Sequence, residues 1–281
     1  MRRVLVTGAG GMLGTELLGT LGGVTDVVGR DVGDFDVTDP EATLDAVRSI
    51  APDVVVNCAG YTDVDGAESH EDFAFAVNAA GAGHLARAAR EARAYFLHMS
   101  TDYVFDGSKR SPYTESDDPR PINAYGRSKL AGERAVAEAG GRSLIVRTAW
   151  LYGRAGRNFV DTMLGLAAQG GPLRVVDDQV GPPTSARDLA VMLSELIPSR
   201  ATGVVHATNS GHCSWHTLAR TALDLSGFEG VDVRPVPSSE FPRPAERPRY
   251  SVLALDAFVS IVGWRPRAWD DALREYLCER R

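Results

Sequence analysis

The first fifteen residues contain the pattern that most restricts the fold. A short apolar run, Val4-Leu5-Val6, leads into a glycine-rich segment, residues 7–14, with glycines at positions 8, 11 and 14. A helix is expected from about Thr15. Glycines at this spacing permit a tight strand-to-helix turn, close approach of the backbone to a pyrophosphate, and close packing of helix on strand. Because the helix N-terminus points free N–H groups at phosphates, the pattern predicts a dinucleotide site.

The same order of strand and helix continues through residue 150. Apolar runs predict strands at 26–29, 53–57, 94–99 and 143–147, and helices are predicted at 40–50, through 67–92 and from 123. Apolar strands separated by helices are typical of a parallel sheet covered on both faces. We therefore expect an α/β fold, a Rossmann-type doubly wound parallel sheet, with ligands beyond the carboxyl ends of its strands.

A tyrosine and a lysine, Tyr125 and Lys129, lie four residues apart in the helix predicted from Asn123. On one helix face, the ammonium would stabilise the phenolate and lower the Tyr125 pKa from about 10. The alternative is an ordinary surface lysine. However, only two of the 30 basic residues are lysine, and a compact ammonium perturbs a neighbouring pKa in a way that a guanidinium does not. Tyr125 is therefore a candidate general acid.

Residues 100–107, Ser-Thr-Asp-Tyr-Val-Phe-Asp-Gly, follow the strand predicted at 94–99. The hydroxyl of Thr101 is placed to donate a hydrogen bond to the same substrate oxygen that Tyr125 would protonate. The alternative is a turn residue with a local hydroxyl bond. Its position between the strand and the Tyr125 helix favours the catalytic interpretation.

The strand predicted at 26–29 ends at Arg30-Asp31. An acidic residue there would hold the ribose hydroxyls of NAD, whereas an arginine would meet the 2′-phosphate of NADP. Both residue types are present, so the pattern leaves both cofactors open. For a reductase we expect NADPH, with NADH also accepted.

The net charge limits the classes of binding partner to be expected, and the cysteine content indicates the cellular compartment. The net charge of −7 argues against nucleic-acid or anionic-membrane partners. Three cysteines, Cys58, Cys213 and Cys278, match no metal-binding spacing and indicate free thiols in a reducing compartment. The apolar run after Arg3 is too short for a signal peptide. We expect a cytoplasmic protein, monomeric or homodimeric, without a metal site.

Several segments together carry a family resemblance. Residues 7–14, 57–60, 100–107 and 125–129 resemble the extended short-chain dehydrogenases/reductases, and residues 59–68, 100–107, 177–184 and 244–248 are similar to the dTDP-4-dehydrorhamnose reductase family. The similarity runs in order over nearly the whole chain. It implies an NAD(P)H-dependent oxidoreductase of nucleotide-sugar biosynthesis that reduces the 4-keto group of a dTDP-4-keto-6-deoxysugar, converting dTDP-4-dehydro-L-rhamnose to dTDP-L-rhamnose.

The resemblance also implies roles for individual residues. Thr101, Tyr125 and Lys129 form a catalytic trio. The cofactor would be held by Gly8, Gly11, Met12 and Leu13, beside Gly14, at the pyrophosphate, by Arg30 and Asp31 at the ribose, by Asp36 and Val37 near the adenine, and by Ala59, Gly60, Tyr61, Tyr125 and Lys129 along its middle. Substrate contacts would come from Asp102, Tyr103, Trp150 and Arg247. The chain departs from the family at Cys58 with Gly60, where alanine is common, and at Arg30 beside Asp31.

Beyond Trp150 the alternation of strands and helices loosens. Helices are predicted at 158–168, 185–197 and 215–225, strands at 173–176 and 203–206, and the proline-rich run 235–248 is expected to be a loop. No linker separates two halves. We therefore expect residues 1–150 to form the cofactor-binding domain, and residues 151–281 to form mainly a smaller, interwoven C-terminal α/β substrate domain, with some later segments returning to the first.

Other functions remain open at this point. The same fold serves 4-ketoreductases of other dTDP-deoxysugars in secondary metabolism, dehydratases, epimerases, and a non-catalytic NADP-binding regulatory subunit. In the resembling dehydratases, Asp-Glu follows the catalytic threonine, whereas here Asp102-Tyr103 follows. Base rates favour a core position for His98 and Trp150, although the place of Trp150 at a strand end also suits a platform for a sugar. Arg247 could be a plain surface charge, but in a loop near a nucleotide-sugar site we expect it to bind a diphosphate through bidentate hydrogen bonds.

Overall fold

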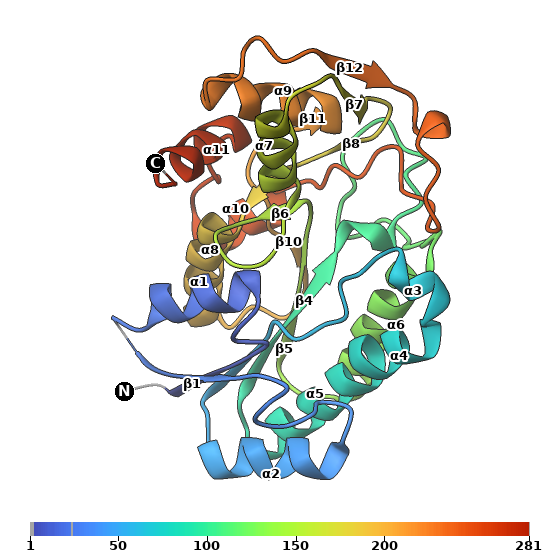
Figure 1. Cartoon of the computed structure of the whole chain (residues 1–281). Coiled ribbons are helices and arrows are strands. Elements are labelled where there is room, and N and C mark those ends of the chain that lie inside the picture. Colours follow the sequence, from blue (N-terminus) through green and yellow to red (C-terminus); the bar gives the residue numbers. More distant parts are fainter. Residues whose placement is uncertain (1–2, 24, 281) are drawn as a thin grey trace.

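A computed structural model describes residues 3–23 and 25–280 (Figure 1), and its centre is a parallel sheet. The six strands are β1 (Arg3–Thr7), β2 (Asp26–Arg30), β3 (Val54–Asn57), β4 (Tyr95–Thr101), β5 (Ser143–Thr148) and β10 (Gly203–His206). They lie in the order β10-β5-β4-β3-β1-β2, and every neighbouring pair is parallel. The chain order reverses beside β1, so a ligand crevice is expected at the carboxyl ends of β1 and β3.

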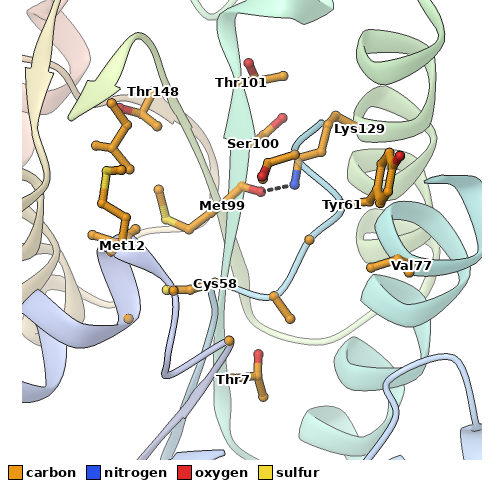
Figure 2. A pocket seen from close by; sticks show the side chains of 18 of the residues that line it. Thr7, Met12, Cys58, Tyr61, Val77, Met99, Ser100, Thr101, Lys129 and Thr148 are labelled. Carbon is orange, nitrogen blue, oxygen red and sulfur yellow. Dashed lines mark hydrogen bonds between the residues drawn. The ribbon is translucent and has the colours of Figure 1, made fainter. Parts of the chain in front are cut away.

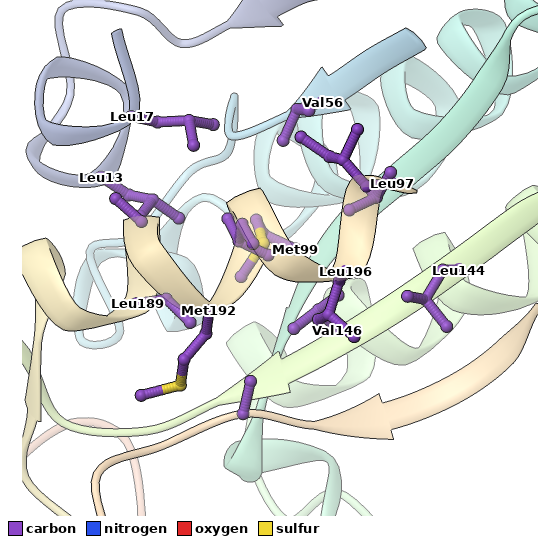
Figure 3. Packing of buried hydrophobic residues seen from close by; sticks show 14 of the residues in the cluster. Leu13, Leu17, Val56, Leu97, Met99, Leu144, Val146, Leu189, Met192 and Leu196 are labelled. Atoms are coloured by element: carbon purple, nitrogen blue, oxygen red, sulfur yellow. The ribbon is translucent and has the colours of Figure 1, made fainter. Parts of the chain in front are cut away.

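Helices cover both faces of this sheet, as expected. One face carries α1 (Met12–Leu21), α8 (Ala186–Ser199) and α10 (Asp256–Val262), and the other carries α2 (Pro40–Ile50), α5 (Ala82–Glu91) and α6 (Ala124–Glu138). Figure 3 shows Leu189, Met192 and Leu196 of α8 in one cluster with Leu13 and Leu17 of α1 and with residues of the strands, among them Val56 and Leu97. The doubly wound α/β prediction is confirmed. Within residues 3–23 and 25–280, no helix is both long and apolar enough to cross a membrane.

The helical region predicted at 67–92 contains a change of helix type. It comprises α3 (Gly66–Ser69), α4 (Glu71–Phe75), a π-helical turn (Ala76–Gly81) and α5. π-Helical turns are rare and occur frequently at functional sites. This one lies against α6, the helix that carries Tyr125.

A second lobe with two smaller cores lies above the large sheet in the view of Figure 1. It is built from α7 (Phe159–Gln169), β7 (Leu173–Val176), β8 (Val180–Gly181), β11 (Cys213–Ser214), α9 (Trp215–Leu225), β12 (Val233–Val236) and α11 (Trp269–Cys278). The short strands β6 (Leu151–Tyr152) and β9 (Thr184–Ser185) pair where the two lobes meet. Strand β10 and helices α8 and α10 come from the later half of the chain but pack on the large sheet.

The prediction that 235–248 is entirely a loop is wrong at its start. Pro235 lies within β12, which pairs in parallel with β7, and Ser238–Glu240 form a short 3-10 helix. The amides of Leu173, in β7, and of Asp177, directly after it, donate to the carbonyls of Asp232 and Val236. Proline is tolerated in such a two-stranded edge because its missing N–H is not needed for the ladder.

Candidate active site

A cavity of about 710 Å³ opens at the carboxyl ends of β1, β3, β4 and β5. Cavities of this size are typical of small-molecule and cofactor sites. Every site residue predicted from the sequence lines it except Arg247. The cavity therefore brings together residues as far apart in the chain as Thr7 and Arg157.

The glycine-rich turn between β1 and α1 forms one wall of the cavity. Gly8 has a φ of +66°, and a Cβ atom there would lie 2.6 Å from the Ala59 nitrogen. A Cβ at Gly14 would lie 2.2 Å from a loop carbonyl oxygen. Helix α1 begins after Gly11 without a side-chain cap, so its first N–H groups are available to an anion. This backbone cradle fits a pyrophosphate.

The end of β2 carries Arg30 and Asp31, the two residues from which the sequence could not decide between NAD and NADP. The carboxylate of Asp31 accepts hydrogen bonds from the Gly10 amide (2.7 Å) and the Val32 amide (2.8 Å). The Arg30 guanidinium lines the cavity and donates to the Gly29 carbonyl at 3.0 Å. Asp31 thus holds the glycine turn, while Arg30 presents a positive charge to the cavity.

Tyr125 and Lys129 lie on consecutive turns of α6, as predicted. The helix begins at Ala124 because the Asn123 side chain caps it, accepting from the Gly126 amide at 2.7 Å. The Lys129 ammonium is buried and donates to the Met99 carbonyl of β4 at 2.6 Å (Figure 2). Thr101, at the end of the same strand, hydrogen-bonds Tyr125 and donates to Asp102 at 3.0 Å.

The pKa shift expected for Tyr125 is wrong in direction. Burial raises its pKa to about 12, and the hydrogen bond with Thr101 only partly opposes this. The Lys129 ammonium, itself buried, has its pKa lowered to about 8 by desolvation. The spacing of Tyr125 and Lys129 predicts only the effect of the ammonium, whereas the loss of solvent around the phenol is the largest influence on its pKa.

Asp102 and Tyr103 form a short 3-10 helix (Asp102–Val104) directly after Thr101. The Asp102 carboxyl is 1% exposed, and its burial raises the pKa to about 6. The ring of Tyr103 packs edge-on against Tyr125, with the ring centres 5.6 Å apart. Both side chains therefore lie beside the candidate acid.

Trp150 follows β5 and lines the cavity from the side of the second lobe. Its φ of +47° is unusual for a bulky residue, and such backbone strain concentrates at functional sites. The indole stacks on Trp215 at 3.5 Å with an angle of 6° between the planes. At Gly181, a Cβ would lie 2.4 Å from the same indole. Trp215, which the sequence analysis did not single out, thus holds Trp150 in the cavity wall.

Arg247 is the predicted residue that lies outside the cavity lining. Its guanidinium makes a bidentate ion pair with Asp65, at 2.6 and 2.8 Å, and hydrogen-bonds Tyr103. The hydrogen bond from Arg247 is the main reason that the pKa of Asp65 is held below its usual value. Arg247 therefore contacts the site through Tyr103 in this arrangement.

Two buried polar residues near the trio were missed. Asn78, in the π-helical turn, bonds both the amide and the carbonyl of Tyr61 (2.8 and 3.0 Å) and the Ser128 hydroxyl (2.9 Å). Glu133 lies one turn beyond Lys129 on the same face of α6 and is 5% exposed. The four-residue spacing from Lys129 to Glu133 was visible in the sequence, whereas the contacts of Asn78 depend on the π-helical turn.

Comparison with known proteins settles the family. The whole chain, residues 1–281, matches the family described as RmlD substrate binding domain. The chain belongs to this family. Among its RmlD-family relatives, the dTDP-4-dehydrorhamnose reductase of Mycobacterium tuberculosis is 45% identical over 279 residues, covering 96% of this chain and 91% of the relative.

Two further RmlD-family relatives are informative. The dTDP-4-keto-6-deoxy-D-glucose reductase of Streptomyces niveus is 45% identical over 276 residues, covering 97% of this chain and 96% of the relative. The crystal structure of a dTDP-4-dehydrorhamnose reductase from Bacillus anthracis, in complex with NADP, is 38% identical with a TM-score of 0.96 and covers 99% of both chains. The resemblance stated from the sequence, and the assignment as an NAD(P)H-dependent oxidoreductase, are confirmed.

Proposed function

We propose that this protein uses NADPH to reduce the 4-keto group of dTDP-4-dehydro-L-rhamnose, giving dTDP-L-rhamnose. The observation that carries the proposal is the convergence of Thr101, Tyr125 and Lys129 on one cavity that also contains the glycine cradle. The relatives named as dTDP-4-dehydrorhamnose reductases support the substrate. An NADP-bound relative supports the cofactor.

In the proposed reaction, bound NADPH supplies the hydride. The Tyr125 phenol, protonated at neutral pH because of its raised pKa, donates a proton to the oxygen at C4. Thr101 orients that oxygen through its hydroxyl. Lys129, held by the Met99 carbonyl, places a positive charge near the phenolate that remains. Asp102, Tyr103 and Trp150 would contact the sugar nucleotide, and Arg247 would act through Tyr103.

The end of β2 supports a preference for NADPH over NADH. The carboxylate of Asp31 is engaged by the glycine turn, which leaves it less free to bind the ribose hydroxyls. Arg30 offers a guanidinium to a 2′-phosphate. The remaining predicted contacts also line the cavity, where Asp36 and Val37 would lie near the adenine and Ala59, Gly60 and Tyr61 along the middle of the cofactor.

A second candidate differs only in the sugar. The Streptomyces niveus relative acts, by its name, on dTDP-4-keto-6-deoxy-D-glucose and is as similar to this chain as the Mycobacterium tuberculosis enzyme. Both substrates present a 4-keto group to the same trio. Competition between the two sugar nucleotides in one assay, compared as kcat/KM, decides between them.

The division of the chain and its setting are proposed as follows. Residues 1–150 bind mainly the cofactor and residues 151–281 mainly the sugar nucleotide. Free Cys58, Cys213 and Cys278 are compatible with a reducing cytoplasm. The oligomeric state, monomer or homodimer, stays a prediction that light scattering coupled to gel filtration would test.

The decisive experiment follows NADPH oxidation with dTDP-4-dehydro-L-rhamnose made in situ. The wild-type protein should turn over, and Tyr125→Phe should bind NADPH normally while kcat falls by about a hundredfold or more. Tyr113→Phe is the matched control, because it also removes a buried phenolic hydroxyl, one that bonds Asp106 away from the cavity. A Tyr125→Phe protein with near-normal turnover would overturn the proposed mechanism.

A further inference from the structure

Behind the cavity lies a buried ionic cluster that the proposed mechanism does not use. The Glu133 carboxylate accepts three hydrogen bonds: from the Ser100 hydroxyl (2.5 Å), from Arg147 Nε (2.8 Å) and from Arg147 Nη2 (2.7 Å). The side chains of the ion pair are only 4% and 6% exposed. Burying two charges is costly, and replacing such a pair with apolar residues often costs no stability. Stability alone is therefore a weak explanation for it.

The cluster joins the elements that carry the candidate catalytic groups. Glu133 is on α6, one turn after Lys129 and two turns after Tyr125. Ser100 is on β4, between Met99, whose carbonyl holds Lys129, and Thr101. One carboxylate thus fixes α6 against β4 at the level where the three catalytic side chains meet.

The charge of Glu133 also acts on Lys129. Removal from water lowers the pKa of the ammonium to about 8, and Glu133 is the largest influence opposing that shift. The charged or titratable groups that act on Lys129 or lie beside it are Glu133 on α6, Cys58 after β3, His98 on β4 and, behind Glu133, Arg147 on β5. Tyr125 lies one turn before Lys129 on α6. His98 is buried with its pKa well below the usual value, so it stays neutral and adds no charge.

We propose that Glu133 is a positioning residue of this reductase: through Ser100 it sets the register of α6 on β4, and through its charge it keeps Lys129 protonated at working pH. The proposal rests on the proposed function only for its kinetic consequence. The electrostatic part concerns the chain alone and is measurable without turnover, whereas the register part is measured through kcat.

The chain offers a direct readout, because it contains only two lysines, Lys109 and Lys129. Lysine labelled with ¹³C at Cε gives two side-chain signals, and Lys109→Arg assigns them. In Glu133→Gln the Lys129 signal should titrate about one pH unit lower than in the wild type, since the neutral amide leaves Arg147 uncompensated beside the ammonium. An unchanged titration in a folded Glu133→Gln protein overturns the electrostatic part.

Two further variants separate register from charge. Ser100→Ala keeps every charge and loses the bond to Glu133, so kcat should fall about tenfold while the Lys129 titration does not move. Glu133→Asp keeps the carboxylate on a shorter side chain. The Lys129 signal should therefore titrate as in the wild type, while kcat should stay below the wild-type value. Glu133→Asp also serves if Glu133→Gln does not fold. Ser100→Ala with wild-type kcat overturns the register part.

The matched control is Arg127→Gln on the same helix. It breaks an exposed ion pair with Glu71 (2.9 Å) and should change neither kcat nor the Lys129 titration. If the wild-type protein shows no turnover at all, the proposed function fails, while the NMR titration still decides the electrostatic role of Glu133. A loss of thermal stability in Glu133→Gln with an unmoved titration assigns the cluster a purely structural role and refutes the proposal.

Discussion

Replacing Asp102 with asparagine should make the protein more stable at neutral pH. The carboxyl is 1% exposed, and Thr101 donates to Oδ1 at 3.0 Å. Among the described residues, Oδ2 has no partner of good hydrogen-bond geometry, although the Ser251 hydroxyl lies close enough to oppose the shift in part. A buried carboxylate with an unpaired oxygen is expensive, and accordingly burial raises the Asp102 pKa to about 6.

The expected gain in the free energy of unfolding follows from proton linkage. With a folded pKa of about 6 and an unfolded value of about 4, the native state of Asp102 binds more protons than the unfolded state between these values. The free energy of unfolding therefore falls as pH rises through this window, by about 3 kcal/mol in total, and the penalty is fully present above pH 6. Asparagine does not titrate, so Asp102→Asn escapes the penalty and loses only about 1 kcal/mol of hydrogen bonding.

The assay is thermal unfolding of both proteins across pH 4 to 7. The Tm of Asp102→Asn minus that of the wild type should rise by roughly 6 °C over this range. Asp106→Asn is the control: a hydrogen bond from the Ser108 amide holds the Asp106 pKa below its usual value, so this carboxyl stays ionised from pH 4 to 7 and the Tm of Asp106→Asn should lie below that of the wild type by a nearly constant amount. If the plots of Tm against pH for Asp102→Asn and the wild type run parallel across this range, the raised pKa of Asp102 and the reasoning built on it are refuted.

Three further predictions concern binding. Arg30→Ala should raise the KM for NADPH by about 10- to 100-fold and leave that for NADH nearly unchanged, because charge-assisted hydrogen bonds to the 2′-phosphate are lost. Gly14→Ala should weaken NADPH binding more than about tenfold in a fluorescence titration, since its Cβ would lie 2.2 Å from a backbone oxygen, whereas Gly19→Ala, with no atom within 4 Å, should not. Trp215→Leu should raise the KM for the dTDP-sugar by roughly 3- to 10-fold without affecting that for NADPH, because Trp150 loses its stacking partner. An unchanged KM for NADPH contradicts the Arg30→Ala prediction, and an unchanged KM for the dTDP-sugar contradicts the Trp215→Leu prediction. Equal effects of Gly14→Ala and Gly19→Ala contradict the glycine prediction.

The parts of the fold predictable from the sequence are those set by local patterns. Helix α2 begins at Pro40 and ends at Ile50, as predicted, because Asp39 caps its N-terminus and proline stands at its first position. The glycine turn and the pair Tyr125 and Lys129 are equally local, and both reach the cavity. Here the spacing of a few residues decides the geometry.

The parts that were missed depend on contacts between distant segments. Trp215 meets Trp150 only because β8 and β11 pair and bring α9 to the cavity wall. Arg247 was expected to meet a diphosphate, yet Asp65, 182 positions earlier, engages its guanidinium. No spacing in the sequence encodes such a pairing, since it arises from how the two lobes close on each other.

The raised pKa of Tyr125 suits a reductase better than the lowered value that the sequence argument expected. Reduction leaves an alkoxide at C4, which is a far stronger base than a phenolate, so proton transfer from Tyr125 is downhill even with a pKa of about 12. A phenol shifted to near neutrality would be partly ionised before substrate arrived, and the ionised fraction cannot act as an acid. Burial keeps Tyr125 protonated, and the charge on Lys129 is then needed after the transfer, when a phenolate must be stabilised in a site from which water is excluded. On this reasoning, the group whose ionisation limits the reaction at high pH is Lys129, with a pKa of about 8, and not Tyr125.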